Sequence, residues 1–292
     1  MKVSDLALFS SLRDSIITAA DNLEVAQQQL ATGKRVAEPS DDPAAFAQAS
    51  LLAAERSATA NDGTLAALMQ SRLNVADGAL AQTTTAITAA MASAMQGADG
   101  TISAAQMATI AKTVQGQLDQ IIQSANVDYA GVHLFGGNQT QAIPFSPTGT
   151  YAGDTGSNSA TFSNGSSIPV TFNGQSIFGD STSGAIGALS ALVAALTAGD
   201  KAGVSATLPQ LSAALQQVSD ARASIGASIN NASALAAGAN ATLISLDDNI
   251  NQVAGADIAR TAMAVKQAIV QEEALVSFAS AIMRLPLVNI LV

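Results

Sequence analysis

Apolar residues near the amino terminus recur in steps that alternate between three and four residues. This seven-residue rhythm places the side chains on one face of an α-helix, and it is typical of helices that pack against partner helices at a shallow angle. We therefore predict a long amino-terminal helix with one apolar stripe. The stripe contains Phe9, Leu12, Ile16, Ala19, Leu23, Ala26 and Leu30, and all but the two alanines are candidate subunit contacts.

The carboxyl-terminal segment repeats this rhythm and predicts a second amphipathic helix. A single helix in water is only marginally stable, so each stripe must be buried against a partner. The pattern leaves open whether that partner is the other end of the chain or a neighbouring copy. The stripe contains Ile258, Ala262, Val265, Ile269, Glu272, Val276, Ala279 and Met283, and its candidate subunit contacts are Ile258, Val265, Ile269, Val276 and Met283.

Helical patterning also fills much of the chain between these ends. A second helix is predicted from Pro43 to about Gln96, where a Gly-Ala-Asp-Gly sequence interrupts it. A third helix follows to about Asn126, and helical patterning returns at about Gly184 and continues to the end.

The connection between the first two helices gathers charged and turn-forming residues. Gly33 suits the left-handed position just beyond a helix end, and Lys34 and Arg35 place cations near that negative pole. Asp42 followed by Pro43 is typical of an N-cap and first helical residue. We interpret the cluster as a capped junction, and Lys34 and Arg35 are also candidates for contact with acidic residues of a neighbouring subunit.

Residues 127–183 differ in character from the rest of the chain, because they are rich in glycine and aromatic residues and poor in charge. Short runs of alternating residues between Asn-Gly turns predict a small antiparallel β insert, although a disordered linker has a similar composition. The expected runs are 160–163, 168–172 and 176–178, and the expected turns are at 164–165 and 173–174.

Together these patterns predict a mainly α protein with a small β insert, in which both chain ends contribute to a long antiparallel helical bundle or coiled coil. Residues 1–31 and 256–292 are expected to form a terminal coiled-coil domain. Residues 32–126 and 184–255 are expected to form a helical bundle domain, and residues 127–183 a β-rich outer domain.

Composition narrows the possible functions. The formal net charge of −10 and the scattered basic residues argue against binding to nucleic acid. Cysteine is absent, which excludes disulfides and thiolate metal sites. The first 30 residues lack the apolar core of a cleaved signal peptide, and no long apolar run predicts membrane insertion.

Candidate catalytic groups all have simpler structural interpretations. His133 is the single histidine and lacks the partners of a zinc site or catalytic triad. The carboxylate pairs at 41–42 and 272–273 suit capping and solvated surfaces. Gly136-Gly137 lacks the Lys-Ser/Thr ending of a phosphate loop and is better explained as a tight turn. We therefore predict no catalytic, cofactor or metal site and no enzymatic activity.

Several motifs give the chain a family resemblance. The amino-terminal sequences LATGKRV (30–36) and PSDDPA (39–44) resemble those of the bacterial flagellin family. The carboxyl-terminal sequences LDDNI (246–250), ADIA (256–259) and RLPLVNIL (284–291) are similar to the end of that family.

A stretch of the insert narrows the resemblance. The sequence GVHLFGGNQT (131–140), followed by Pro144-Phe145, resembles the family members that join the flagellar hook to the filament more than it resembles filament flagellin. This resemblance implies a structural subunit that is exported unfolded through the flagellum's own channel, without a cleaved signal, to an extracellular location. It also implies a ring-like self-assembly, contacts with neighbouring hook-associated and flagellin subunits, and an export chaperone as partners.

Two other functions remain alternatives. A short filament flagellin would share the helical ends, and long Ala-rich antiparallel helices also occur in bacterial signalling coiled coils. The signalling class normally carries a membrane span or a sensory domain, and the sequence displays neither.

Overall fold

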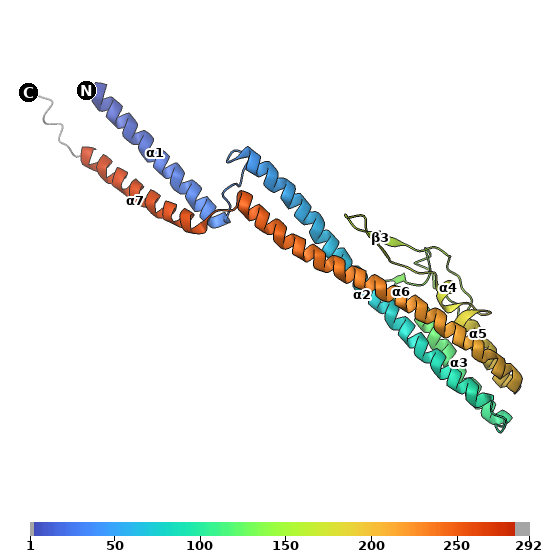
Figure 1. Cartoon of the computed structure of the whole chain (residues 1–292). Coiled ribbons are helices and arrows are strands. Elements are labelled where there is room, and N and C mark those ends of the chain that lie inside the picture. Colours follow the sequence, from blue (N-terminus) through green and yellow to red (C-terminus); the bar gives the residue numbers. More distant parts are fainter. Residues whose placement is uncertain (1–2, 284–292) are drawn as a thin grey trace, which may run out of the picture. The chain divides into compact units, whose positions relative to one another are not determined.

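The computed structural model describes residues 3–283, and it describes the side-chain surroundings of residues 10–281. Helices dominate this part of the chain, as Figure 1 shows. In chain order the elements are α1 (Val3–Thr32), α2 (Pro43–Gly97), α3 (Ala104–Ala125), β1 (Asp128–Tyr129), β2 (Val132–His133), β3 (Ser159–Thr161), β4 (Ser167–Pro169), α4 (Gly174–Phe178), α5 (Gly184–Ala198), α6 (Lys201–Ala254) and α7 (Ile258–Met283).

The predicted fold class is confirmed, and the ends of the long helices fall close to their predicted positions. The second helix ends at Gly97 and the third at Ala125, each within one residue of expectation. A capping box starts the third helix, because Ser103 accepts from the Gln106 amide while the Gln106 side chain accepts from the Ser103 amide. Helical structure returns at Gly184 as predicted.

Contacts within the chain divide it into two compact units. We call Met1–Ser57 with Thr242–Val292 the terminal unit, and Ala58–Ala241 the central unit. The three-part division expected from the sequence has other boundaries and stays a prediction.

Small side chains let the helices of the central unit approach closely. Ala76, Ala90 and other alanines are fully buried beside Leu73 and Leu80. Where α2 passes α6, a Cβ on Gly63 would lie 3.3 Å from the Ala239 Cβ. Alanine combines this close approach with a high helix propensity, which explains how long helices form with few large side chains.

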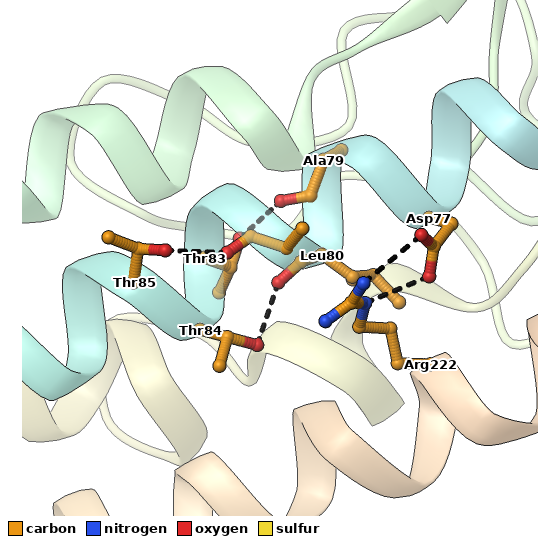
Figure 2. A network of polar contacts seen from close by, with 8 residues as sticks. Asp77, Ala79, Leu80, Thr83, Thr84, Thr85 and Arg222 are labelled. Carbon is orange, nitrogen blue, oxygen red and sulfur yellow. Dashed lines mark hydrogen bonds and ion pairs between the residues drawn. The ribbon is translucent and has the colours of Figure 1, made fainter.

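A bidentate ion pair joins α2 to α6 in the same unit, as Figure 2 shows. The Arg222 Nε and Nη2 atoms donate to the two carboxylate oxygens of Asp77 at 2.8 and 3.2 Å. The hydrogen bond and the charge of Asp77 raise the pKa of Arg222. Nearby, the fully buried Thr83 hydroxyl donates to the Ala79 carbonyl at 2.9 Å, so this polar group is satisfied within its own helix.

The insert contains less strand than the sequence predicts. Among the described residues it has two short antiparallel hairpins, β1–β2 and β3–β4, with Ala160 opposite Ile168 in the second hairpin. The prediction of a strand at residues 176–178 is wrong, because these residues lie in α4. The Asn173 side chain accepts from the Ser176 amide and so starts a helix, which places Phe178 in the core.

Aromatic rings provide the core of the insert. Phe135 and Phe178 contact edge to face with ring centroids 4.9 Å apart, and Phe145 lies 5.0 Å from the Tyr151 ring centroid. The Asn126 side chain exchanges two hydrogen bonds of 2.8 Å with the backbone of Phe145, which fixes this aromatic residue of the insert to the end of α3.

Candidate assembly surfaces

The amino-terminal stripe lies where α1 contacts α7. These two helices run side by side in the terminal unit (Figure 1). Ala19 and Ala26 are buried, and Leu12, Ile16 and Leu23 are half-buried. Leu30 is exposed at the end of α1, and Phe9 lies in α1 with its side chain outside the described part.

The α7 face that contacts α1 differs from the predicted stripe. Apart from the half-buried Ala262 at its flank, buried or half-buried side chains recur along α7 in steps of four and three residues, which defines one helical face. Val265 is the predicted contact that lies on this face. Its members are Thr261, Val265, Ala268, Glu272, Leu275 and Ala279.

The other large members of the predicted stripe do not face α1. Ile258, Ile269 and Val276 are exposed along its flank, and Met283 ends α7 with its side chain outside the described part. The carboxyl-terminal motif at 284–291 lies outside the described residues. The sequence pattern missed Thr261 and Ala268 because they are small or polar, although small residues allow close helix packing.

A further apolar surface lies on the far side of α7. Met263 and Val270 are both 65% exposed and are separated by seven residues, so they share one face. At about 100° per residue, this face is opposite to Thr261 and Ala268. Together with Ala274 and the polar Lys266, Gln267 and Gln271, these side chains line a shallow, open depression. The helix therefore presents apolar side chains toward α1 and away from it.

The connection between α1 and α2 is held by the connection between α6 and α7. Gly33 has φ +68°, and its carbonyl accepts from the Ala256 amide at 2.9 Å. The amides of Arg35 and Val36 both donate to the Ala254 carbonyl, at 2.8 and 3.2 Å. The last carbonyls of α6 are thus satisfied by a segment more than 200 residues away in sequence. We call residues 33–42 and 253–257 the joint.

The Arg35 side chain links the end of α6 to the start of α2. Its Nη2 donates to the Val253 carbonyl at 2.8 Å, and its Nη1 lies 3.6 Å from the Asp42 carboxylate. Asp42 also accepts from the Ala45 amide at 3.0 Å, and Pro43 is the first residue of α2. Lys34 is exposed and pairs through its backbone with Gly255.

Asp41 closes the loop in front of α2. Its Oδ2 accepts from the amides of Ala37 and Glu38, both at 2.9 Å. These hydrogen bonds, led by that of Glu38, lower the pKa of Asp41. The capping residues of the joint are recognisable in the sequence, but the sequence pattern did not predict that Val36 is buried there.

Gly136 and Gly137 lie in a close-packed turn of the insert. Gly137 has φ +68°, and a Cβ there would lie 2.2 Å from the Asp154 Oδ1. The Gly136 backbone pairs with Asn173 in an antiparallel bridge. Asp154 accepts from the amides of Asn138 and Gly156 at 2.8 and 2.9 Å, and these bonds lower its pKa.

The described residues contain few groups suited to catalysis or metal binding. The His133 Nδ1 lies 3.0 Å from the Asn126 carbonyl oxygen at the start of the insert. Within residues 3–283, no group of three or more His, Cys, Asp or Glu residues is placed to hold a metal ion. None of the described helices is long and apolar enough to cross a membrane.

Comparison with known proteins finds similarity to flagellar proteins. Residues 3–140 match the family model of the bacterial flagellin N-terminal helical region. Flagellar hook-associated protein 3 of Salmonella typhimurium is 27% identical over 188 residues, which cover 64% of this chain and 59% of that protein. The Escherichia coli protein of the same name is 29% identical over 161 residues, which cover 54% of this chain and 51% of that protein. This chain therefore spans just over half the length of these curated relatives.

Solved structures share the fold at lower sequence identity. A putative flagellar hook-associated protein from Vibrio parahaemolyticus matches with a TM-score of 0.68 and 20% identity, over 74% of this chain and all of that chain. The flagellar junction protein FlgL from Legionella pneumophila matches with a TM-score of 0.59 and 13% identity, over 71% of this chain and 99% of that chain. The resemblance expected from the sequence motifs is confirmed: residues 3–140 match the flagellin N-terminal helical region, and the chain is similar to hook-associated protein 3.

Proposed function

We propose that this chain is a structural subunit that joins the hook of the bacterial flagellum to the filament, and that it assembles through its paired terminal helices. The names of its relatives support this function, since both curated proteins are hook-associated protein 3 and one structural neighbour is described as a junction protein.

The observation that carries the proposal is the second apolar face of α7. One face of this helix already contacts α1, yet Met263 and Val270 remain exposed on the opposite face and Ile269 and Val276 on its flank. Large apolar side chains that are exposed together on one face of a helix are typical of an interaction site. In a polymer, α1 covers one face of α7 and a neighbouring subunit covers the other.

Several finer parts of the proposal follow from the family resemblance. The expected partners are copies of this chain, a neighbouring hook-associated protein, flagellin and an export chaperone. The expected location is the extracellular flagellum, reached through the flagellar export channel. Residues 1–31 with 256–292 would form the terminal coiled coil, residues 32–126 with 184–255 the helical bundle, and residues 127–183 the outer part.

Deletion of the gene in the parent bacterium tests the proposed function directly. Electron microscopy of the deletion strain should show intact hooks without filaments, together with filaments released into the medium. Complementation with the full chain should restore attached filaments. Filaments that stay attached in the deletion strain would contradict a junction role.

Assembly of the purified chain separates a junction protein from a filament flagellin. The junction protein should bind the ends of isolated hooks without forming long filaments. Growth of long filaments from the purified chain in a kosmotropic salt would instead identify a flagellin.

A further inference from the structure

Two Asn-Gly pairs in the insert offer the same covalent chemistry in different surroundings. In such a pair, the glycine backbone nitrogen can attack the asparagine Cγ. The new N–C bond forms and the Cγ–N bond of the side chain breaks. The proton lost by the glycine nitrogen is balanced by the one that the leaving –NH₂ gains as it departs as ammonia, and the product is a five-membered succinimide. Water then opens this ring to aspartate or isoaspartate. Glycine favours the attack because it has no side chain and its backbone is mobile. The pairs are Asn164-Gly165 and Asn173-Gly174.

The first pair lies in the exposed turn of the β3–β4 hairpin. Asn164 and Gly165 are both exposed, and a Cβ added to Gly165 would meet nothing within 4 Å. The Gly165 amide donates to the Phe162 carbonyl at 2.9 Å, and the Ser166 amide donates to the Asn164 Oδ1 at 2.9 Å. Both bonds stay within the turn, so they can open without disturbing the core.

The second pair is held by contacts with distant parts of the insert. Gly174 is buried, and its amide donates to the Phe135 carbonyl at 3.0 Å. A Cβ there would lie 2.4 Å from that same oxygen. Asn173 uses its side-chain oxygen to cap the Ser176 amide and pairs through its backbone with Gly136. Cyclisation at Asn173 would therefore break the start of α4 and its contact with the aromatic core.

We propose that Asn164 is a site of spontaneous deamidation in the folded chain, and that the fold protects Asn173 from the same reaction. The co-reactant is water, and the products are ammonia and an aspartate or isoaspartate at position 164. Before the Gly174 nitrogen can attack, its hydrogen bond to the buried Phe135 carbonyl must break, and this raises the activation barrier for cyclisation at Asn173. The expected ratio of rates is about tenfold or more, and tenfold corresponds to about 1.4 kcal/mol of barrier.

Deamidation would place a new negative charge beside an existing carboxylate. The Ser163 amide donates to both carboxylate oxygens of Asp62 in α2, at 3.3 and 3.2 Å. An aspartate or isoaspartate at 164 adds a negative charge to the residue next to that amide, and this charge repels the Asp62 carboxylate. Isoaspartate also lengthens the backbone of the turn. The modification is therefore expected to loosen the attachment of the hairpin to α2.

Peptide mapping of the purified full chain tests the proposal with an internal control. The chain is incubated at mildly alkaline pH and digested with chymotrypsin, which cleaves after aromatic residues. Cleavage after Phe162, Phe172 and Phe178 yields the peptides 163–172 and 173–178, and each contains one of the two Asn-Gly pairs. Mass spectrometry then follows the exchange of –NH₂ for –OH in each peptide. The same incubation in urea measures both rates in the unfolded chain.

The expected result is conversion of peptide 163–172 at least about tenfold faster than peptide 173–178 in the folded chain. In urea the two peptides should convert at similar rates, and Asn164→Gln should abolish conversion of its peptide in the folded chain. Equal conversion rates of the two peptides in the folded chain would overturn the proposal. A large difference that persists in urea would also overturn it, because local sequence would then explain the difference.

Discussion

Gly137 shows how a single position in the insert is fixed by its surroundings. Its positive φ favours glycine, and the Asp154 carboxylate occupies the space that a Cβ would need. Gly131 also has a positive φ, +78°, but no atom lies within 4 Å of the place where its Cβ would be. Substitution of each glycine by alanine therefore separates two costs: backbone strain at both positions, and a steric clash at Gly137 alone.

We expect Gly137→Ala to destabilise the insert more than Gly131→Ala does. The left-handed conformation should cost about 1–2 kcal/mol in either variant. At Gly137 the clash with Asp154 should add about 2 kcal/mol, since neighbouring atoms must shift. Chemical denaturation of both variants, followed through the aromatic residues of the insert, measures the difference. An equal decrease in the free energy of unfolding in both variants would show that the Asp154 contact adds no cost.

Acid should weaken the turn before α5 through Asp180. The Thr182 hydroxyl and amide donate to its Oδ1 at 2.7 and 2.8 Å, and these bonds lower the Asp180 pKa from 3.8 to about 2. A depressed pKa in the folded state stabilises the fold above the ordinary value, and this contribution is lost as the pH falls through about 2.

Asp180→Asn should therefore make stability less dependent on pH between about 4 and 2 than it is in the unaltered chain. Urea denaturation at a series of pH values measures this slope. A slope that stays the same in the variant would exclude Asp180 as its source.

At the scale of elements, α7 shows what the sequence pattern could and could not predict. Its helical structure and amphipathic character follow from the spacing of apolar residues. The pattern could not choose between two apolar faces, and the structure turns Ala268 and Thr261 toward α1 while Ile269 and Val270 stay exposed. Residues 176–178 were missed for a related reason, because the cap that starts α4 depends on one side chain, Asn173, that also suits a turn.

The two faces of α7 should respond differently to the same substitution. Ala268→Asp places a carboxylate against α1 and should destabilise the α1–α7 pair by about 2 kcal/mol or more, because a buried charge lacks a partner. Val270→Asp lies on the exposed face and should cost about 0.5 kcal/mol or less. Hydrogen exchange of the α1 and α7 amides in the isolated chain measures both effects. Similar exchange in the two variants would contradict the assignment of faces.

The joint is a second element whose partners could not be predicted from local rules. Gly33 and the Asp42-Pro43 pair are recognisable in the sequence, but the hydrogen bond from Arg35 to Val253 spans 218 residues. Long-range contacts of this kind depend on the whole fold. The spacing of charges along the chain gives no sign of them.

Replacement of Arg35 should loosen the joint and leave the helices intact. Arg35→Ala removes the bond to the Val253 carbonyl and the ion pair with Asp42, and for an exposed side chain this should cost about 1 kcal/mol or less. Hydrogen exchange at the amides of Val36 and Ala256 should accelerate, with unchanged helical circular dichroism. Arg13→Ala is the matched control, since Arg13 contacts only its exposed neighbour Asp14 among the contacts described. Equal exchange in both variants would remove Arg35 from the joint.

At the scale of the whole molecule, the sequence predicted the fold class and the long helices on either side of the insert, but not α4, and the motifs at both ends predicted the family resemblance. Which residues remain free to contact other subunits emerged only from the structure, because burial depends on how distant segments pack. In the proposed assembly, neighbouring subunits cover the exposed apolar face of α7. Val270 is 65% exposed on that face, and Ile143 in the insert is 64% exposed and so offers a matched control.

Binding of the purified chain to isolated hooks tests this claim most directly. The unaltered chain, Val270→Asp and Ile143→Asp are each sedimented with hooks, and the bound fraction is measured. We predict that Val270→Asp loses binding while its helical content matches that of the unaltered chain, and that Ile143→Asp binds normally. Normal binding by Val270→Asp would contradict the account.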